Sequence, residues 1–241
     1  MKLEHDHGKA AIAKRFAAGH KPFYLGDFIY GGIDGSITTF AIVAGVVGAA
    51  LSSNVILILG LANLLADGFS MAASNYSGTK ARLDDLDRLR EVEARHTQLD
   101  PAGEAEEVRQ ILAQKGLKGE TLNDAVNTIA ADRQTWIDFM LVEEYGLSLN
   151  QPSPVVAGLT TFTAFLICGT VPLLPFLFDM KSAFLTSTIM TGFVFFLIGA
   201  VKSKWATTTW WRSGLETFLI GGTAATIAYT IGHFLRGIYQ M

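Results

Sequence analysis

The sequence predicts an all-α integral membrane protein with five transmembrane helices and a small cytoplasmic helical domain between the second and third of them. Three observations support this fold class. Half of the 241 residues are hydrophobic and only 17% are charged, against about 25% in ordinary soluble domains. Five windows are apolar over the roughly 20 residues that a helix needs to cross a bilayer. Between the second and third windows the chain becomes highly charged.

The predicted spans follow a polar N-terminal tail, in which we expect the short EHDHGK run to be disordered. The spans cover residues 28–50, 54–77, 155–178, 182–201 and 214–235. We therefore divide the chain into an N-terminal tail (1–22), the first two spans (23–78), an acidic helical metal-binding domain (79–150) and the last three spans (151–241).

The acidic domain has its own helical signals. Residues 80–150 hold fifteen Asp and Glu against nine Lys and Arg, a net charge of −6, whereas the rest of the chain has a net charge of +3. Residues 79–98 keep a helical periodicity, so we expect the second transmembrane helix to continue beyond the membrane. Asp100 and Pro101 predict the start of the next helix, because Asp is a good N-cap and Pro suits the first turn.

Two further signals divide the remainder of this domain. Thr121 with Asp124 resembles a capping box and predicts a second helix start. A last helix around Trp136 to Tyr145 is expected to stop at Gly146, because glycine commonly ends helices. Three or four short helices are therefore expected.

The distribution of Lys and Arg predicts the orientation. Five of them precede the first span, and three more, Lys202, Lys204 and Arg212, lie between the fourth and fifth spans. The opposite side has only Lys181 and Arg236. The positive-inside rule then puts the N-terminus and the acidic domain in the cytoplasm. No secretory or sorting segment is visible, so we expect a bacterial inner membrane rather than a vacuole.

Two carboxylates lie inside apolar spans: Asp34 in DFIYGGIDGSITTFAIVAGVVGAAL and Asp67 in VILILGLANLLADGFSMAASNY. A charged side chain at the bilayer centre costs at least about 2.5–3.5 kcal/mol on insertion scales, and such residues commonly mark ion or proton pathways. The structural alternative is a buried carboxyl held neutral by hydrogen bonds.

Other polar residues share the helix faces of these carboxylates. Asp27 precedes Asp34 by two helical turns, although it could equally be a solvated residue at the helix end. Asn63, Asp67 and Met71 follow each other at intervals of four and so line one stripe of the second span. This stripe could coordinate a dehydrated divalent cation.

The acidic domain carries pairs of candidate metal ligands at one-turn spacing. The pairs are Glu93 with His96, Glu104 with Glu107, and Met140 with Glu144. An imidazole and a thioether beside carboxylates favour Fe²⁺, Mn²⁺, Co²⁺ or Zn²⁺ over Ca²⁺. The alternative is a solvated helix face with weak ion pairs.

Four segments resemble the vacuolar iron transporter family: DFIYGGIDGSITTFAIVAG, GLANLLADGFSMAASNY, WIDFMLVEEYG and GTVPLLPFLF. The resemblance implies a homodimer with five spans per subunit, a translocation path at the subunit interface and a cytoplasmic metal-binding domain. It assigns the path to Asp27, Asp34 and Met71. It assigns the domain's metal ligands to Glu93, Glu104, Glu107, Met140 and Glu144.

The chain departs from the pattern expected of that family at two positions. Asn63 stands where a path glutamate is expected, with Asp67 one turn further on as a possible replacement. His96 stands where another glutamate of the domain is expected. Both departures bear on metal preference and on the number of protons exchanged.

These observations predict a transporter that moves Fe²⁺ or Mn²⁺ out of the cytosol in exchange for protons, with Co²⁺ and Zn²⁺ as further candidate ions. Metal and protons would compete for the same carboxylate oxygens. We expect a homodimer in a lipid bilayer, with no resident cofactor and no nucleic-acid partner. Two alternatives stay open: a membrane-embedded metal-dependent enzyme, for which no catalytic motif is found, and a membrane-anchored metal buffer or sensor.

Overall fold

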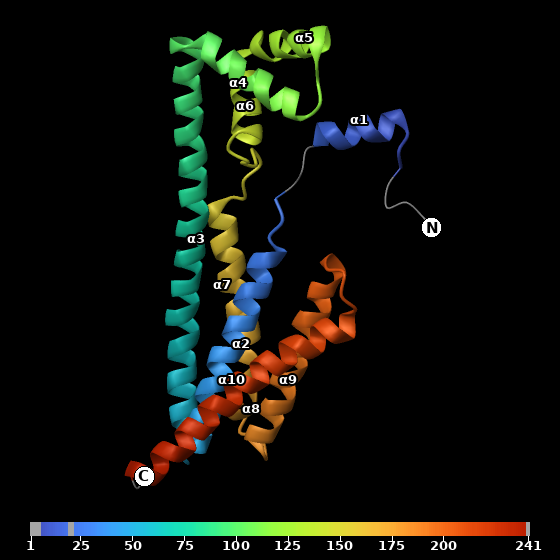
Figure 1. Ribbon diagram of the computed structural model, residues 1–241. Coiled ribbons are helices and arrows are strands. Elements are labelled where there is room, and N and C mark those ends of the chain that lie inside the picture. Colours follow the sequence, from blue (N-terminus) through green and yellow to red (C-terminus); the bar gives the residue numbers. More distant parts are fainter. Residues whose placement is uncertain (1–5, 19–21, 240–241) are drawn as a thin grey trace. The chain divides into compact units, whose positions relative to one another are not determined.

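The computed structural model describes residues 6–18 and 22–239 (Figure 1). Within these residues every regular element is a helix and no β-strand occurs, which confirms the all-α class. The chain divides into two compact units. We call Phe23–Gly78 with Pro154–Met241 the membrane unit, and Thr79–Ser153, to which the N-terminal segment up to Pro22 is assigned, the acidic unit.

Five helical segments are long and apolar enough to cross a membrane, which confirms the predicted number of spans. They are built on α2 (Leu25–Gly48), α3 (Ser53–Leu99), α7 (Pro154–Thr170), α9 (Ala183–Lys202) and α10 (Trp210–Tyr239). The third continues through the 3₁₀ turn η1 (Val171–Leu173) into α8 (Leu174–Leu177), and the fourth ends in η2 (Ser203–Trp205). The break after Thr170 coincides with Pro172, which has no backbone N–H to donate.

Helix α3 is 47 residues long, more than twice the roughly 20 residues that a span requires. Its first part, up to Gly78, belongs to the membrane unit, and the part from Thr79 onward belongs to the acidic unit. The predicted continuation of the second transmembrane helix is therefore confirmed.

Helix α2 is the central helix of the membrane unit and packs against α7, α9 and α10. Small residues make this packing possible. A Cβ atom on Gly35 would lie 2.5 Å from the backbone oxygen of Phe165 in α7, which is closer than real side-chain contacts. The approach of α2 and α7 therefore depends on glycine, as is common where transmembrane helices meet. Val43 and Phe165 are completely buried in the adjoining apolar core.

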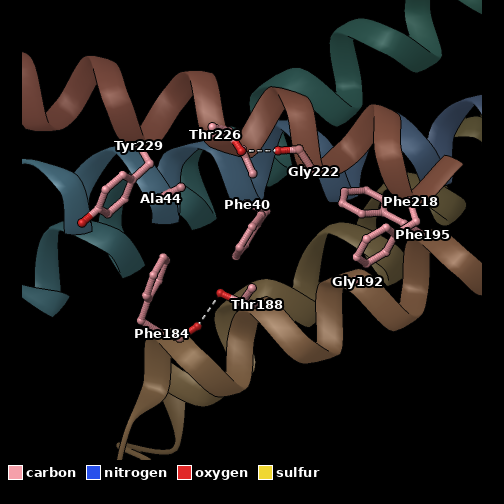
Figure 2. Close-up of a pocket in the computed structure, with 11 residues that line it drawn as sticks. Phe40, Ala44, Phe184, Thr188, Gly192, Phe195, Phe218, Gly222, Thr226 and Tyr229 are labelled. Atoms are coloured by element: carbon pink, nitrogen blue, oxygen red, sulfur yellow. Dashed lines mark hydrogen bonds between the residues drawn. The ribbon is translucent and has the colours of Figure 1, made fainter. Parts of the chain in front are cut away.

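An apolar cavity of about 390 Å³ lies between α2, α9 and α10 (Figure 2). The eleven described residues that line it include no charged side chain. The hydroxyl groups of Thr188 and Thr226 donate to the backbone of their own helices, at 2.8 Å in both cases. The cavity lining therefore offers no carboxylate that could bind a cation.

The acidic unit contains the distal part of α3 together with α4 (Pro101–Gln114), α5 (Gly119–Ala130) and α6 (Arg133–Glu143). As predicted, α4 starts after Asp100, whose side chain accepts a hydrogen bond of 3.0 Å from the Gly103 N–H. Asp132 caps α6 in the same way. The apolar core of the unit includes Val108, Val126, Trp136 and Met140, with a second cluster of Leu86, Ile137 and Leu141.

One local prediction is wrong. The helix expected to start at Thr121 begins earlier, at Gly119, after the extended residue Lys118, and no described side chain caps it. The EHDHGK run, expected to be disordered, lies partly outside the described residues and leads into the helix α1 (Lys9–Ala18). Its sequence, KAAIAKRFAA, is half alanine, and alanine is the strongest helix former.

Candidate functional site

The carboxylates of Asp34 in α2 and Asp67 in α3 lie within electrostatic reach of each other in the membrane unit. Both side chains are only partly buried in the single chain. Two acidic groups within electrostatic reach repel each other when both are ionised, and binding of a cation or a proton relieves that repulsion. The structure therefore places the two intramembrane carboxylates that the sequence singled out within electrostatic reach of each other.

Asn63 takes part in a polar link between the same two helices. Its Nδ2 donates a hydrogen bond of 3.2 Å to Oγ1 of Thr38, whose hydroxyl donates to the backbone oxygen of Asp34 at 2.9 Å. The amide side chain thus joins α3 to α2 one turn beyond Asp34. Met71, on the same stripe of α3, packs against the apolar core of the membrane unit, and its role as a metal ligand stays a prediction.

A hydrogen-bond network joins Asp27 to two residues that the sequence analysis did not single out. Nδ2 of Asn75 donates to Oδ1 of Asp27 at 2.8 Å and to Oγ1 of Thr161 at 2.7 Å. The buried Thr161 hydroxyl donates to the backbone oxygen of Ala157 at 3.1 Å. Asn75 continues the stripe of α3 that begins at Asn63 and repeats every four residues, so this spacing could have identified it. Nothing in the sequence indicated a role for Thr161.

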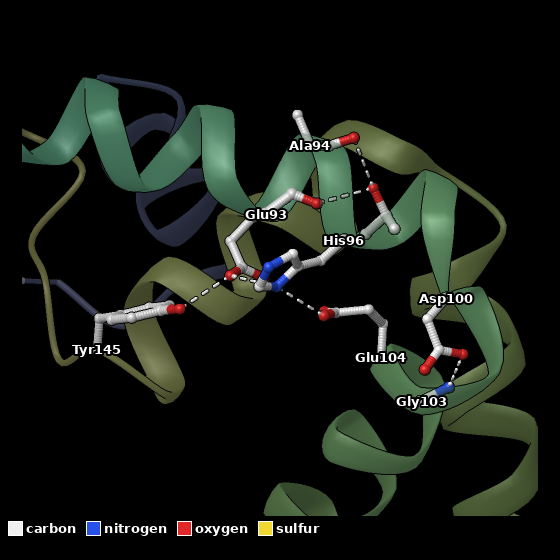
Figure 3. Close-up of polar contacts among 8 residues, drawn as sticks. Glu93, Ala94, His96, Asp100, Gly103, Glu104 and Tyr145 are labelled. Carbon is white, nitrogen blue, oxygen red and sulfur yellow. Dashed lines mark hydrogen bonds and ion pairs between the residues drawn. The ribbon is translucent and has the colours of Figure 1, made fainter.

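A second cluster lies in the acidic unit, where Glu93 and Glu104 are buried with 1% and 5% of their surfaces exposed. Nδ1 of His96 is 3.2 Å from Oε1 of Glu104 and 3.9 Å from Oε1 of Glu93. Figure 3 shows the imidazole between the two carboxylates. The hydroxyl of Tyr145, which the sequence analysis did not select, donates to Oε1 of Glu93 at 2.9 Å. We call Glu93, His96, Glu104 and Tyr145 the acidic cluster.

The charges of this cluster change its proton affinities. Burial, followed by the nearby charges of Glu93 and Glu107, raises the pKa of Glu104 to about 7. Partial burial and the same two charges raise the pKa of Glu144. Burial and the hydrogen bond to Glu93 raise the pKa of Tyr145, so this phenol remains a hydrogen-bond donor at neutral pH. The cluster therefore favours a positive partner, either a proton or a metal ion.

Among the described residues, neither Oε2 of Glu93 nor Oε2 of Glu104 accepts a hydrogen bond, and the two carboxyl groups lie close enough to share a proton. Unsatisfied buried carboxylate oxygens are costly, and a bound cation would satisfy them. As they stand, no group of three or more His, Cys, Asp or Glu side chains among residues 6–18 and 22–239 is arranged to hold a metal ion. The donor types fit a metal, whereas a closed coordination shell would require side chains to move.

The other predicted ligands of the acidic unit lie in different surroundings. Glu107 and Glu144 are exposed but lie close enough to act on the buried glutamates electrostatically. Met140 is completely buried and belongs to the apolar core with Val108 and Trp136. Core packing explains the burial of Met140, and its role as a ligand stays a prediction.

The fold and the polar residues define a multi-pass helical membrane protein with carboxylates inside its spans. Comparison with known protein families agrees with this class. The family model described as the VIT family matches residues 25–233. The chain belongs to this family, which confirms the resemblance inferred from the sequence motifs.

Curated relatives are similar over most of the chain. The protein named vacuolar iron transporter 1 of Arabidopsis thaliana is 33% identical over 228 residues, covering 92% of this chain and 89% of the relative. The vacuolar iron transporter of Toxoplasma gondii is 32% identical over 225 residues, covering 88% of this chain and 74% of the relative. The one of Plasmodium berghei is 28% identical over 225 residues, covering 88% and 82%.

Proposed function

We propose that this protein transports Fe²⁺ or Mn²⁺ out of the cytosol in exchange for protons, as a homodimer. Co²⁺ and Zn²⁺ are weaker candidates as cargo. Membership of the VIT family and the names of the relatives support iron as a cargo. The observation that carries the proposal is that Asp34 and Asp67, on two helices apolar enough to cross a membrane, lie within electrostatic reach of each other.

The exchange chemistry follows from these two carboxylates. A divalent cation that enters the bilayer must replace its hydration shell with protein ligands, and two carboxylates together neutralise its charge. When the metal leaves, the two carboxylates are left to repel each other and would take up protons instead. Because metal and protons compete for one set of oxygens, release of one is linked to binding of the other.

The homodimer would complete the ligand set. In one chain, Asp34, Asp67 and Met71 supply two carboxylates and one thioether, and all three are only partly buried. The same segment of α3 has an apolar exposed face, on which Ile58, Leu65 and Phe69 are between 63% and 68% exposed. A second copy packed along α3 would cover this face and double the number of ligands, with the path at the interface.

In this proposal the acidic unit faces the cytosol and collects metal for the path. Rotation of His96, whose side chain is 51% exposed, would let its imidazole and the free oxygens of Glu93 and Glu104 share a metal ion. Imidazole favours transition metals over Ca²⁺ and Mg²⁺. Glu107 and Glu144 would attract cations to the entrance through their negative charge.

Flux measurements test the proposal. The purified protein is reconstituted into liposomes, and uptake of Fe²⁺, Mn²⁺, Co²⁺ and Zn²⁺ is followed with and without a pH gradient. We expect flux of Fe²⁺ or Mn²⁺ that rises when protons are more concentrated on the destination side of the metal. Absence of flux for all four ions under every gradient would refute transport.

A pair of variants separates transport from metal buffering. Asp34→Asn removes the intramembrane charge, whereas Asp179→Asn makes the same change at an exposed position between α8 and α9. We expect Asp34→Asn, but not Asp179→Asn, to abolish flux. Metal binding by the acidic unit should survive in Asp34→Asn. A membrane-anchored buffer would protect cells from metal equally well with either variant.

A further inference from the structure

The two oxygens of the buried Glu93 carboxylate have different environments. Oε1 accepts the hydrogen bond of 2.9 Å from the Tyr145 hydroxyl, whereas Oε2 is buried and accepts no hydrogen bond from residues 6–18 or 22–239. Because the whole side chain is 1% exposed, water does not readily replace a missing partner. One oxygen is thus occupied by a neutral donor and the other is available to a cation.

The backbone after α6 holds the Tyr145 ring in place. The Tyr145 N–H donates to the backbone oxygen of Met140, and the N–H of Leu147 donates to that of Leu141 at 3.0 Å. Between them, Gly146 has a φ of +66°, a left-handed conformation that glycine adopts without strain. The ring also packs against the cluster of Leu86, Ile137 and Leu141. The hydroxyl is therefore a fixed donor rather than a mobile surface group.

From this asymmetry we infer that Tyr145 is a positioning residue that restricts Glu93 to binding a metal through one oxygen, and that this restriction favours small transition-metal ions over Ca²⁺. The inference rests on the proposed metal-binding role of the acidic cluster. Figure 3 shows the Glu93 carboxylate between the Tyr145 ring and the His96 imidazole. Nδ1 of His96 lies 3.9 Å from the same Oε1 that accepts the Tyr145 hydrogen bond, so a metal ion shared by His96 and the free Oε2 would require the imidazole to rotate.

The expected selectivity follows from coordination chemistry. Ca²⁺ takes six to eight oxygen ligands at about 2.3–2.6 Å and often binds a carboxylate through both oxygens. Transition metals suit a site that combines single carboxylate oxygens with an imidazole, such as that of His96. An oxygen that is already bound to the Tyr145 hydroxyl is a poorer second ligand for Ca²⁺. Removing that hydroxyl frees both oxygens of Glu93.

The test is the variant Tyr145→Phe, which keeps the packed ring and removes only the hydroxyl. Binding of Mn²⁺ and of Ca²⁺ to the full chain in detergent is measured by titration calorimetry. We expect Mn²⁺ binding to weaken by about tenfold, as is typical when a partner of a metal ligand is lost, while Ca²⁺ binding stays constant or tightens. The preference for Mn²⁺ over Ca²⁺ therefore falls.

A double-mutant cycle with Glu93→Gln shows whether Tyr145 acts through Glu93. In the Glu93→Gln background we expect Tyr145→Phe to have little further effect on either ion. Equal losses in both backgrounds, or an unchanged preference for Mn²⁺ over Ca²⁺, would overturn the inference. If Glu93→Gln alone left Mn²⁺ binding intact, the proposed role of the acidic cluster itself would be refuted. The melting temperature of each variant shows whether it is folded.

Discussion

The side-chain amide of Asn75 donates a hydrogen bond of 2.8 Å to Oδ1 of Asp27 and thereby ties α3 to α2 in the membrane unit. The same nitrogen donates to Thr161 of α7 at 2.7 Å. It also lies 3.3 Å from the backbone oxygen of Ala157, so the two hydrogens of the amide nitrogen are shared among three acceptors. One asparagine therefore connects three spans and holds a predicted path carboxylate as an acceptor.

Replacing Asn75 with alanine should impair transport. The variant Asn75→Ala leaves Asp27 without this donor, and we expect the rate of metal flux to fall by about tenfold. The melting temperature in detergent should fall by about 2–4 °C, because hydrogen bonds between membrane helices contribute about 1 kcal/mol. Asn54→Ala, at an exposed position at the start of the same helix, is the control. Equal flux for the two variants would show that Asn75 does not position Asp27.

Close packing of α2 against α7 predicts a contrast between two glycines of α2. The Cβ atom added by Gly35→Ala meets the backbone of Phe165 at 2.5 Å, whereas a Cβ on Gly26 meets no atom of the described residues within 4 Å. We expect Gly35→Ala to destabilise the protein by about 1–3 kcal/mol and Gly26→Ala to stabilise it slightly, since alanine favours helix. Thermal unfolding in detergent measures both. Similar melting temperatures would show that α2 and α7 can separate without cost.

Loss of carboxylates from the acidic unit should affect metal capture more than translocation. In the double variant Glu104→Ala/Glu107→Ala, we expect metal uptake into liposomes to decline at limiting metal concentration. The maximal rate of uptake should be largely retained. The control is Glu120→Ala, an exposed glutamate of α5. An unchanged apparent affinity for the transported metal would exclude the capture role.

The raised pKa of Glu104 predicts a pH dependence of metal binding. Because its pKa is about 7, this carboxyl is mostly protonated at pH 6 and mostly ionised at pH 8. A metal must displace the proton, so Mn²⁺ affinity should rise across this range, by up to about tenfold per pH unit below the pKa. Titration calorimetry at several pH values should show a weaker dependence for Glu104→Gln than for Glu106→Gln, which alters an exposed neighbour. Parallel pH profiles would contradict the assignment.

Much of the fold could be predicted because membrane insertion imposes simple patterns on a sequence. The lengths of the apolar windows predicted five spans, and the helical periodicity after Gly78 predicted that α3 continues. The helix start after Asp100 was predicted from its capping side chain, whereas the start after Asp132, which is capped in the same way, was not. The prediction failed at Thr121, because α5 starts without any side-chain cap.

By itself, the sequence determined which residues carry charge in apolar surroundings and which share a helix face, since both depend only on composition and on 3.6-residue periodicity. The tertiary structure alone decided which faces meet. It placed Tyr145 on Glu93 and Asn75 on Asp27, pairs separated by 52 and 48 positions, and it buried Met140 in an apolar core. Contacts between distant segments arise from packing, and helical periodicity does not specify them.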